Sequence, residues 1–226
     1  ENRRQHDETE RWALHQLRGG HVEVAVGALR QHGRVVTAPN AETVRDAMVA
    51  DWWTHRVAGS SALMMARRNT DVDDLNRRAR RHVAEVGELQ GPALVVRGRP
   101  FQAGDQVICT RNDYPNGIRN GTVGTITDID HKHRSVTIST DDGDRDLDSD
   151  YLTAGHMRHG YAVTVHKAQG RSSDHGLLLA NDDMHREMGY VGLSRGRDSN
   201  RMYLVDDEAA DELEHHSRPG GRPDPL

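Results

Sequence analysis

Two short stretches of the chain combine the side chains best suited to hold phosphate groups and nucleic acid. The first contains Thr164, His166, Lys167, Gln169 and Gly170. Hydroxyl and amide groups suit hydrogen bonds to phosphate and sugar, lysine supplies positive charge, and glycine lets another backbone approach closely. The second contains Ser194 and Arg195. A guanidinium at a helix end can neutralise a transferring phosphoryl group, although a lone Ser-Arg pair is more often an N-cap or a surface salt bridge.

Apolar runs predict the strands that would position these side chains. Ser61–Ala66 is continuously apolar, as in a buried parallel strand, and a helix is predicted over residues 72–86. The turn between them lies at the carboxyl end of a strand, where open α/β sheets bind ligands. This favours Arg67 and Asn69 as binding residues, while a basic solvated cap explains them equally well. Asn69 or Thr70 is expected to cap the helix.

The same pattern predicts an α/β domain on both sides of a central segment. Trp12, Leu14 and Leu17 give the first expected helix its apolar side. Helices are expected over residues 1–18, 22–31, from 40 onward with Val44, Met48 and Trp52 on one face, and over 183–195. Further strands are expected at residues 34–37, 161–163, 177–180 and 202–205. Strands that alternate with helices indicate a largely parallel sheet.

In the central segment, residues 98–153, the apolar residues recur with a different period. Short alternating strands at residues 104–110, 120–129 and 135–139, joined by glycine-rich turns, predict a small antiparallel barrel. Its tip places Tyr114 between Arg111 and Arg119, an arrangement that can stack and neutralise single-stranded nucleic acid. A solvated hairpin in which Tyr114 packs on Pro115 is the alternative.

Composition limits the class of protein. The chain has 226 residues and a formal net charge of -5, so nucleic-acid binding would have to use local patches. Its single cysteine, Cys109, allows no internal disulfide, which suits a reducing cytoplasm. The scattered histidines show no spacing typical of a metal site, and no apolar run is long enough to cross a membrane. Residues 207–226 are acidic and then rich in proline and glycine, which predicts a flexible tail.

Both stretches resemble helicase motifs. Thr164–Gly170 is similar to motif V of superfamily-one DNA helicases, and Tyr190–Arg197 resembles their motif VI. Asn2–Gln5 is similar to motif IV of the RecD-like branch, and the predicted barrel resembles the SH3-like insert of that branch. The resemblance extends from Asn2 to Val205, in particular to the helicase part of TraA/TraI-type conjugative relaxases of the MobF kind. It implies a RecA-like second helicase domain with a parallel sheet and an inserted SH3-like β-barrel.

The resemblance implies a role for each matching residue. Arg195 is implied to be the arginine finger on the γ-phosphate of ATP, with Arg4 on the same phosphate. Gln169 and Gly170 are implied to line the nucleotide cleft. The residues implied to hold the DNA strand, or to couple it to ATP, are Thr164, His166 and Lys167. Ser172 stands where many relatives carry a glutamate for the ribose, so this ribose contact does not carry over.

The sequence contains no phosphate-binding loop of the Gly-x-x-x-x-Gly-Lys-Ser/Thr type. In the resembled family this loop, and the acidic residues for magnesium, belong to the first RecA-like motor domain. The implied cofactor is therefore ATP with Mg²⁺, bound mostly by that domain. The implied partners are that motor domain and single-stranded DNA. We expect that residues 1–226 alone do not hydrolyse ATP.

The expected organisation follows from these pieces. Residues 1–97 would form the first part of the RecA-like domain, 98–153 the barrel, 154–206 the second part with motifs V and VI, and 207–226 the tail. The implied function is the C-terminal half of an ATP-dependent DNA helicase motor of 5′–3′ polarity from a conjugative relaxase. The alternative is a non-catalytic module, derived from a helicase, that binds single-stranded DNA or acts as a scaffold.

Overall fold

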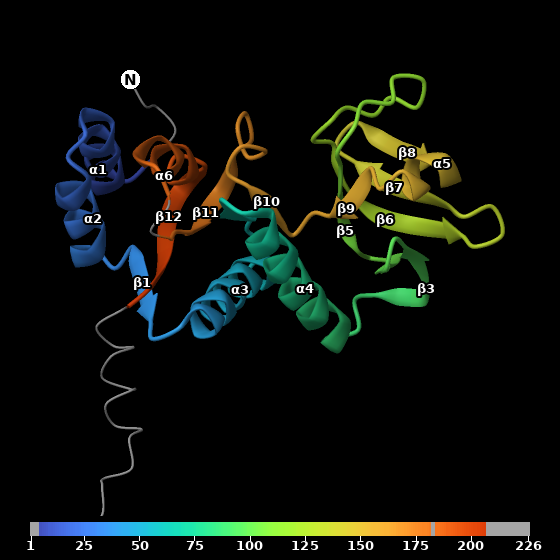
Figure 1. Ribbon diagram of the computed structural model, residues 1–226, viewed down its shortest axis with the longest axis horizontal. Helices are drawn as coiled ribbons and strands as arrows, with labels where there is room; N and C mark the ends of the chain where they lie inside the picture. The colour runs from blue at the N-terminus through green and yellow to red at the C-terminus, as the bar shows by residue number, and fades with distance from the viewer. Residues whose placement is uncertain (1–4, 182–183, 207–226) are drawn as a thin grey trace, which may run out of the picture. The chain divides into compact units, whose positions relative to one another are not determined.

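The computed structural model describes residues 5–181 and 184–206. The chain divides into two compact units, shown along the ribbon in Figure 1. The first comprises Glu1–Arg67 with Ala168–Leu226, and the second comprises Arg68–Lys167. The candidate residues of motif V therefore span the junction, since Lys167 ends the second unit and Ala168 resumes the first.

The first unit is built on parallel strands, as the apolar runs predict. Its strands lie in the order β1 (Val35–Ala38), β12 (Gly196–Val205), β11 (Ser173–Leu179) and β2 (Ala62–Ala66). All three neighbouring pairs are parallel. The predicted buried strand is confirmed in β2, whose last four residues are buried. Strand β12 begins well before the predicted residue 202, because its polar first half pairs with the start of β11.

Four helices of the described chain belong to this unit. They are α1 (Glu8–Gly19), α2 (Val22–Gln31), α3 (Ala41–Val57) and α6 (Arg186–Gly192). Helix α3 begins where predicted because the side chain of Asn40 accepts a hydrogen bond from the Thr43 amide at 2.9 Å. Its Val44, Met48 and Trp52 are buried, as expected from their helical spacing.

The predicted apolar side of α1 is wrong at one residue. Trp12 is 48% exposed, whereas Leu14 and Leu17 are buried. The buried stripe is Glu10, Ala13, Leu14 and Leu17, at intervals of three and four residues. Trp12 lies off this stripe, because each residue turns a helix by about 100°.

The second unit contains a long helix and an antiparallel sheet. Its five-stranded sheet has the order β8-β7-β6-β5-β9, and a separate hairpin is formed by β3 and β4. The bounds are α4 (Asn69–Glu85), β3 (Gln90–Val96), β4 (Arg99–Ala103), β5 (Gln106–Cys109), β6 (Val123–Asp130), β7 (Ser135–Thr140), β8 (Gly143–Leu147), α5 (Ser149–Thr153), β9 (Met157–His159) and β10 (Ala162–Thr164). The predicted strands at residues 104–110, 120–129 and 135–139 correspond to β5, β6 and β7.

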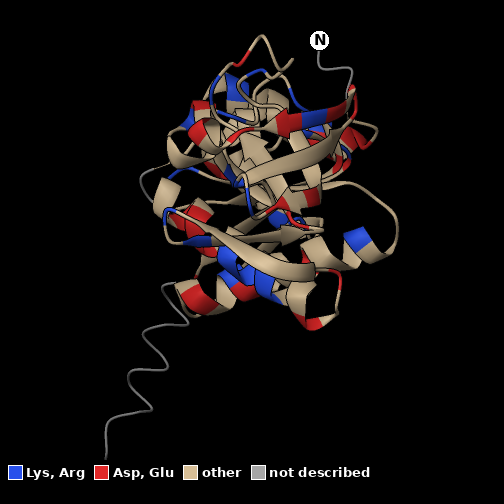
Figure 2. Ribbon diagram, turned by 90° about the vertical axis from the view of Figure 1, so that its right-hand side faces the viewer, with Lys and Arg blue, Asp and Glu red and all other residues tan. Residues whose placement is uncertain are grey.

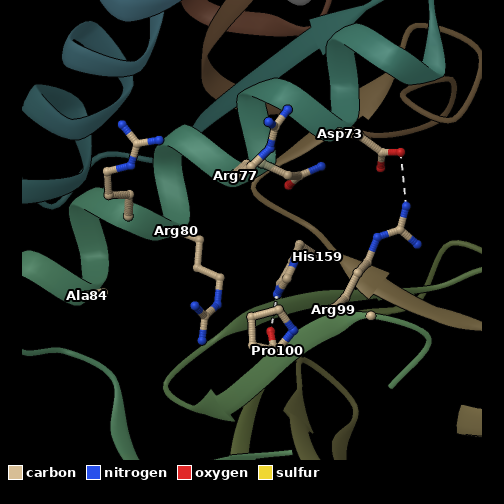
Figure 3. A pocket seen from close by; sticks show the side chains of 10 residues that line it. Asp73, Arg77, Arg80, Ala84, Arg99, Pro100 and His159 are labelled. Carbon is tan, nitrogen blue, oxygen red and sulfur yellow. Dashed lines mark hydrogen bonds and ion pairs between the residues drawn. The ribbon is translucent and has the colours of Figure 1, made fainter. Parts of the chain in front are cut away.

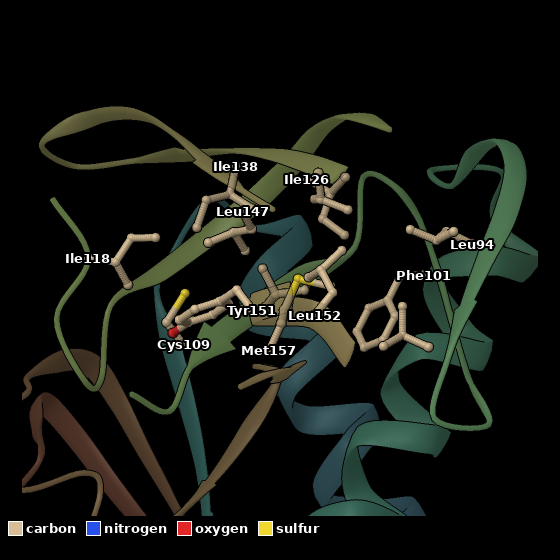
Figure 4. Close-up of a cluster of buried hydrophobic side chains, with 13 residues drawn as sticks. Leu94, Phe101, Cys109, Ile118, Ile126, Ile138, Leu147, Tyr151, Leu152 and Met157 are labelled. Carbon is tan, nitrogen blue, oxygen red and sulfur yellow. The ribbon is translucent and has the colours of Figure 1, made fainter. Parts of the chain in front are cut away.

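A single apolar core joins the hairpin to this sheet. Leu94 and Phe101 of the hairpin pack with Ile126, Ile138 and Leu147 of the sheet, as Figure 4 shows. The hairpin thus contributes to the same core although its first strand begins at Gln90, before the residue at which the sequence period changes. Burial in this core raises the pKa of the Cys109 thiol to about 11, so this cysteine is protonated and unreactive at neutral pH.

Two predicted helix boundaries are wrong. Helix α4 begins at Asn69 rather than at residue 72, and its N-cap is Arg68, which makes no capping hydrogen bond with its side chain. The predicted cap by Asn69 or Thr70 therefore does not form, because both residues already lie inside the first turn. Helix α6 ends at Gly192 rather than at Arg195, so the Ser-Arg pair lies after the helix.

Candidate functional site

In the first unit, Arg195 lies in the turn between α6 and β12. Its Nε donates to the carbonyl of Val191 at 2.9 Å, and Nη2 donates to the Ser194 hydroxyl at 2.7 Å. A longer bond of 3.4 Å joins Nη1 to the carbonyl of Arg171, the residue after Gly170. The guanidinium therefore links the end of motif VI to the end of motif V, and these donors already have partners in the protein.

A buried polar network fixes the backbone next to this arginine. The amide and side-chain nitrogens of Asn200 donate to the two carboxylate oxygens of Glu10 at 2.9 and 2.8 Å. The Asn200 oxygen accepts from the Gly196 amide at 2.8 Å, and Gln5 Nε2 donates to the Gly196 carbonyl at 3.2 Å. Arg34 Nε lies 3.0 Å from Glu10. Burial raises the pKa of Glu10, and the hydrogen bonds from Asn200 oppose that rise.

Gly196 is tightly enclosed in this network. A side-chain carbon there would collide with the carbonyl oxygen of Ser199 and with the amide nitrogen of Gly176. Only glycine fits such an approach without a shift of backbone. The glycine between the two arginines of motif VI therefore sets the close packing of β12 against β11 directly after Arg195.

The end of motif V lies in an irregular turn of the same unit. Gln169 and Gly170 are exposed, and Gly170 has a φ of 83°, in the left-handed region that favours glycine. The next residue, Arg171, has a buried Nη1 with no hydrogen-bond partner in the part of the chain that the structure describes. Burial also lowers the pKa of Arg171. A buried cationic donor without a partner is the kind of group that an anionic ligand would satisfy.

In the second unit, part of the predicted DNA-binding set lines one small cleft. Asn69, Thr164 and Lys167 line it together with Arg158, and its volume of about 20 Å³ is room for about one water molecule. The backbone amide of Lys167 donates to the Thr164 hydroxyl at 3.3 Å. Burial, and secondarily the nearby charge of Arg158, lowers the pKa of Lys167. His166 is exposed and does not line this cleft.

An asparagine holds the strand that leads into the Thr164 turn. Asn76 of α4 is buried, and its oxygen accepts from the Ala162 amide at 3.0 Å. Its side-chain nitrogen donates to the Ala162 carbonyl at 3.0 Å and to the Val72 carbonyl at 2.9 Å. Both backbone groups of Ala162 are thus bound by one side chain, which fixes β10 against α4 and positions Thr164 two residues later.

The predicted aromatic tip is exposed. Tyr114 is 73% exposed, and its hydroxyl accepts from the side chain of Asn112 at 3.0 Å. Arg111 is also exposed, and its guanidinium lies 3.4 Å from the ring nitrogen of His156. The tyrosine ring is therefore available on the surface of the second unit, as stacking with a base would require.

The remaining predicted residues lie apart from these groups. Arg67 follows β2 in the first unit and is partly buried. Arg4 and the predicted tail lie outside the described residues. In the part of the chain that the structure describes, no three histidine, cysteine or acidic side chains form a metal-binding group. None of the described helices is long and apolar enough to cross a membrane.

Sequence reasoning missed the residues that position the motifs. Glu10 and Asn200 are 190 residues apart in the chain, and no spacing rule connects them. The sequence does mark Asn76 as a candidate positioning residue, because it is a polar residue within the apolar stripe of α4 beside Leu75 and Ala79. Arg158 and Arg171 gave no signal that distinguishes them from other arginines. Lysine and arginine are interspersed with acidic residues along the ribbon, as Figure 2 shows, so charge alone does not mark the site.

Comparison with known proteins relates the chain to conjugation proteins and helicases. It is 29% identical to the conjugal transfer protein TraA of Rhizobium radiobacter over 204 residues, which are 88% of this chain and 18% of TraA. It is 31% identical to the multifunctional conjugation protein TraI of Escherichia coli K12 over 176 residues, 72% of this chain and 10% of TraI. Over 101 residues it is 35% identical to the ATP-dependent RecD2 DNA helicase of Deinococcus radiodurans, covering 42% of this chain and 13% of RecD2.

Solved structures agree on the fold. The chain resembles Bacteroides Pif1 bound to single-stranded DNA with a TM-score of 0.58 and 15% identity, over 94% of this chain and 54% of that one. For Pif1 helicase from Candida albicans the TM-score is 0.53 at 16% identity, over 93% and 58% of the two chains. No family model matches the chain.

These findings define a superfamily-one helicase-like domain with an α/β fold and a parallel sheet. More particularly, the domain is related to the conjugal transfer proteins TraA and TraI. The chain spans less than a fifth of the length of TraA, TraI or RecD2.

Proposed function

We propose that this chain is the C-terminal half of an ATP-dependent DNA helicase motor of 5′–3′ polarity, from a protein of the conjugative relaxase type. In this proposal residues 1–97 and 154–206 form the second RecA-like domain, and residues 98–153 form an inserted SH3-like barrel. The observation that supports it best is the cleft of the second unit. The same small space is lined by Asn69 and, nearly a hundred residues later in the chain, by Thr164 and Lys167.

The cleft supplies what a coupling loop for single-stranded DNA needs. A hydroxyl, an amide and an ammonium group converge there, and all three can bind phosphate oxygens. Lys167 is partly buried, so its charge is less screened than that of a surface lysine. Exposed Tyr114 and Arg111 would add a stacking surface and a phosphate contact from the same unit.

On the nucleotide side, Arg195 would be the arginine finger, and Gln169 and Gly170 would line the cleft for ATP. The buried, unpartnered Nη1 of Arg171 fits an anionic group close to these residues. ATP, when bound, supplies the phosphoanhydride whose cleavage drives the motor, and its Mg²⁺ is assigned to the partner motor domain. This chain's part is to present positive charge to the phosphates and to hold the DNA strand.

The test is ATP hydrolysis in two contexts. Residues 1–226 alone should show no hydrolysis stimulated by single-stranded DNA. A longer polypeptide that joins this chain to a domain with a phosphate-binding loop should hydrolyse ATP, and Arg195→Ala should lower its rate by about a thousandfold or more. Arg30→Ala, at an exposed arginine in the last turn of α2, is the control and should leave the rate unchanged.

Two outcomes would contradict the proposal. A steady hydrolysis rate from residues 1–226 alone, lost on Arg195→Ala, would show that the chain is a complete enzyme. Binding of single-stranded DNA without any hydrolysis in the joined polypeptide would favour the alternative, a non-catalytic DNA-binding or scaffold module.

A further inference from the structure

A larger pocket lies beside the small cleft of the second unit. Its volume is about 490 Å³, within the range of pockets that hold small molecules or single nucleotides. Helix α4 forms one side, and the β3–β4 hairpin with the end of β9 forms the other, as Figure 3 shows. None of the residues predicted from the sequence lines it. The arginines that line it are Arg77, Arg80, Arg81 and Arg99.

Arg80 is held in a fixed orientation at this pocket. Its Nε lies 3.0 Å from the carboxylate of Asp105, which is fully buried, and Nη2 donates to Gln102 at 2.7 Å. Asp105 is in turn held by the Tyr161 hydroxyl at 2.8 Å. The Arg80 side chain is only 15% exposed, and its Nη1 has no partner among the described residues. A pre-oriented donor loses little conformational entropy when it binds an anion.

The other arginines also keep donors available. One guanidinium nitrogen of Arg99 donates a hydrogen bond to the Asp73 carboxylate at 3.0 Å. One guanidinium nitrogen of Arg77 donates to the Asp74 carboxylate at 2.8 Å. Arg81 is exposed and makes no ion pair or hydrogen bond within the described chain. Each guanidinium carries five N–H groups, so these contacts do not use all of the donors, although Figure 3 shows the Arg77 side chain pointing away from Pro100 and His159. The arginines outnumber the acidic partners, and the net charge at the pocket is positive.

The hairpin side of the pocket carries apolar groups beside Arg99. Pro100 and His159 lie together there, and the His159 Nε2 donates to the Pro100 carbonyl at 3.0 Å. Burial lowers the pKa of His159, so its ring is neutral at pH 7. The ring packs on Phe101 with centroids 4.5 Å apart. The exposed ring of Pro100, with the 10% exposed side chain of His159 beside it, offers a surface against which a base can pack, near arginines that suit a phosphate.

The pocket adjoins the cleft at Thr164. The two share Asp73, Asn76 and His159 in their linings. Along α4 they extend from Asn69 to Ala84, about 22 Å at a rise of 1.5 Å per residue. The cleft holds no more than a single polar group, whereas the pocket has room for a base and sugar. A strand bound at Lys167 thus has an adjoining space of the right size and charge.

We propose that this pocket binds a nucleotide unit of single-stranded nucleic acid, with the phosphate on the arginines and the base against Pro100 and His159. The proposal rests on the proposed function in that the strand is the one held at Thr164 and Lys167. The same chemistry would recognise a free nucleotide, and the experiment separates the two sources.

The test uses the whole chain with two probes, a labelled oligothymidylate and free thymidine monophosphate. Arg81→Glu reverses a charge that has no partner in the described chain, so the fold should be unaffected. It should weaken oligonucleotide binding about five- to tenfold and reduce the slope of log affinity against log salt by about one. Arg30→Glu is the matched control, an exposed arginine on α2 outside the pocket, and should change affinity by less than about twofold. Equal melting temperatures of both variants would confirm folding.

The outcomes separate this proposal from the proposed function. Lys167→Ala tests the coupling loop, whereas Arg81→Glu tests the pocket. Identical binding of Arg81→Glu and Arg30→Glu to both probes would overturn the pocket, even if Lys167→Ala still weakens oligonucleotide binding. Loss on Arg81→Glu with no effect of Lys167→Ala would support the pocket and contradict the coupling loop. Binding of the monophosphate alone, abolished by Arg81→Glu, would support the site but overturn the strand as its source. Binding of neither probe by the wild type would overturn both proposals.

Discussion

Asn200→Ala should be among the most destabilising substitutions in the first unit. Asn200 is 1% exposed, and its side chain connects the Glu10 carboxylate to both backbone groups of Gly196. Alanine removes the amide group and leaves the space without a polar replacement. One oxygen of a buried carboxylate and one buried amide then lose their partners, while the backbone nitrogen of residue 200 still donates to Glu10.

The magnitude follows from the groups left without partners. A hydrogen bond to a charged group contributes about 1.5–3 kcal/mol, and a buried amide without an acceptor costs about 1–3 kcal/mol. Arg34, 3.0 Å from Glu10, partly compensates the carboxylate. We therefore expect a loss of about 3–5 kcal/mol in the free energy of unfolding, a large share of the roughly 5–15 kcal/mol that holds a domain folded.

Urea unfolding followed by circular dichroism measures this loss. Asn40→Ala is the matched control, because it removes an asparagine from the same unit that makes an exposed helix cap, with an expected cost of about 1 kcal/mol. If Asn200→Ala cost no more than Asn40→Ala with an unchanged denaturant slope, the network would not fix the backbone at Gly196. The positioning argument for Arg195 would then fail as well.

Two further changes test other parts of the structure. Asn76→Ala should lower the free energy of unfolding by about 2–4 kcal/mol in urea, because both backbone groups of Ala162 lose their buried partner. Asn116→Ala, at an exposed asparagine, should lower it by under about 0.5 kcal/mol. Equal losses would contradict the role of Asn76 in fixing β10 against α4. Asp174 has a pKa lowered from 3.8, chiefly by hydrogen bonds from Ser61, so its ionised form stabilises the fold above that value and the stabilisation is lost as pH falls below it. The difference in unfolding free energy between wild type and Asp174→Asn should therefore shrink between about pH 5 and pH 3, and a difference independent of pH would refute the assignment.

Regular elements of the fold could be predicted because their apolar patterns are local. The continuous run in β2 and the spacing of Val44, Met48 and Trp52 in α3 each reflect burial by a single element. The hairpin strand Gln90–Val96 was missed, because only Leu94 and Val96 are buried in it and Gly91 and Pro92 follow its first residue. A strand with so few buried residues carries no alternating pattern to find.

The residues of the candidate site also divide into those that local sequence predicts and those that it does not. Thr164 and Lys167 could be proposed from their motif, and Asn69 from its place after a strand, because local sequence specifies both. Glu10 could not be proposed, since a glutamate in the first turn of a helix normally lies in solvent and favours the helix dipole. Its burial depends on Asn200, which the fold brings to it from the other end of the chain.

The surroundings of Arg195 bear on how an arginine finger would act here. Two of its side-chain contacts are to neutral acceptors, the carbonyl of Val191 and the hydroxyl of Ser194. A bond to a phosphate oxygen is charge-assisted and roughly twice as strong as a bond between neutral groups, so the exchange would be favourable when a phosphate is presented. The backbone need not move in this exchange, because Gly196 stays bound to Asn200. The network with Glu10 would thus keep the point of attachment of Arg195 fixed while its guanidinium reorients.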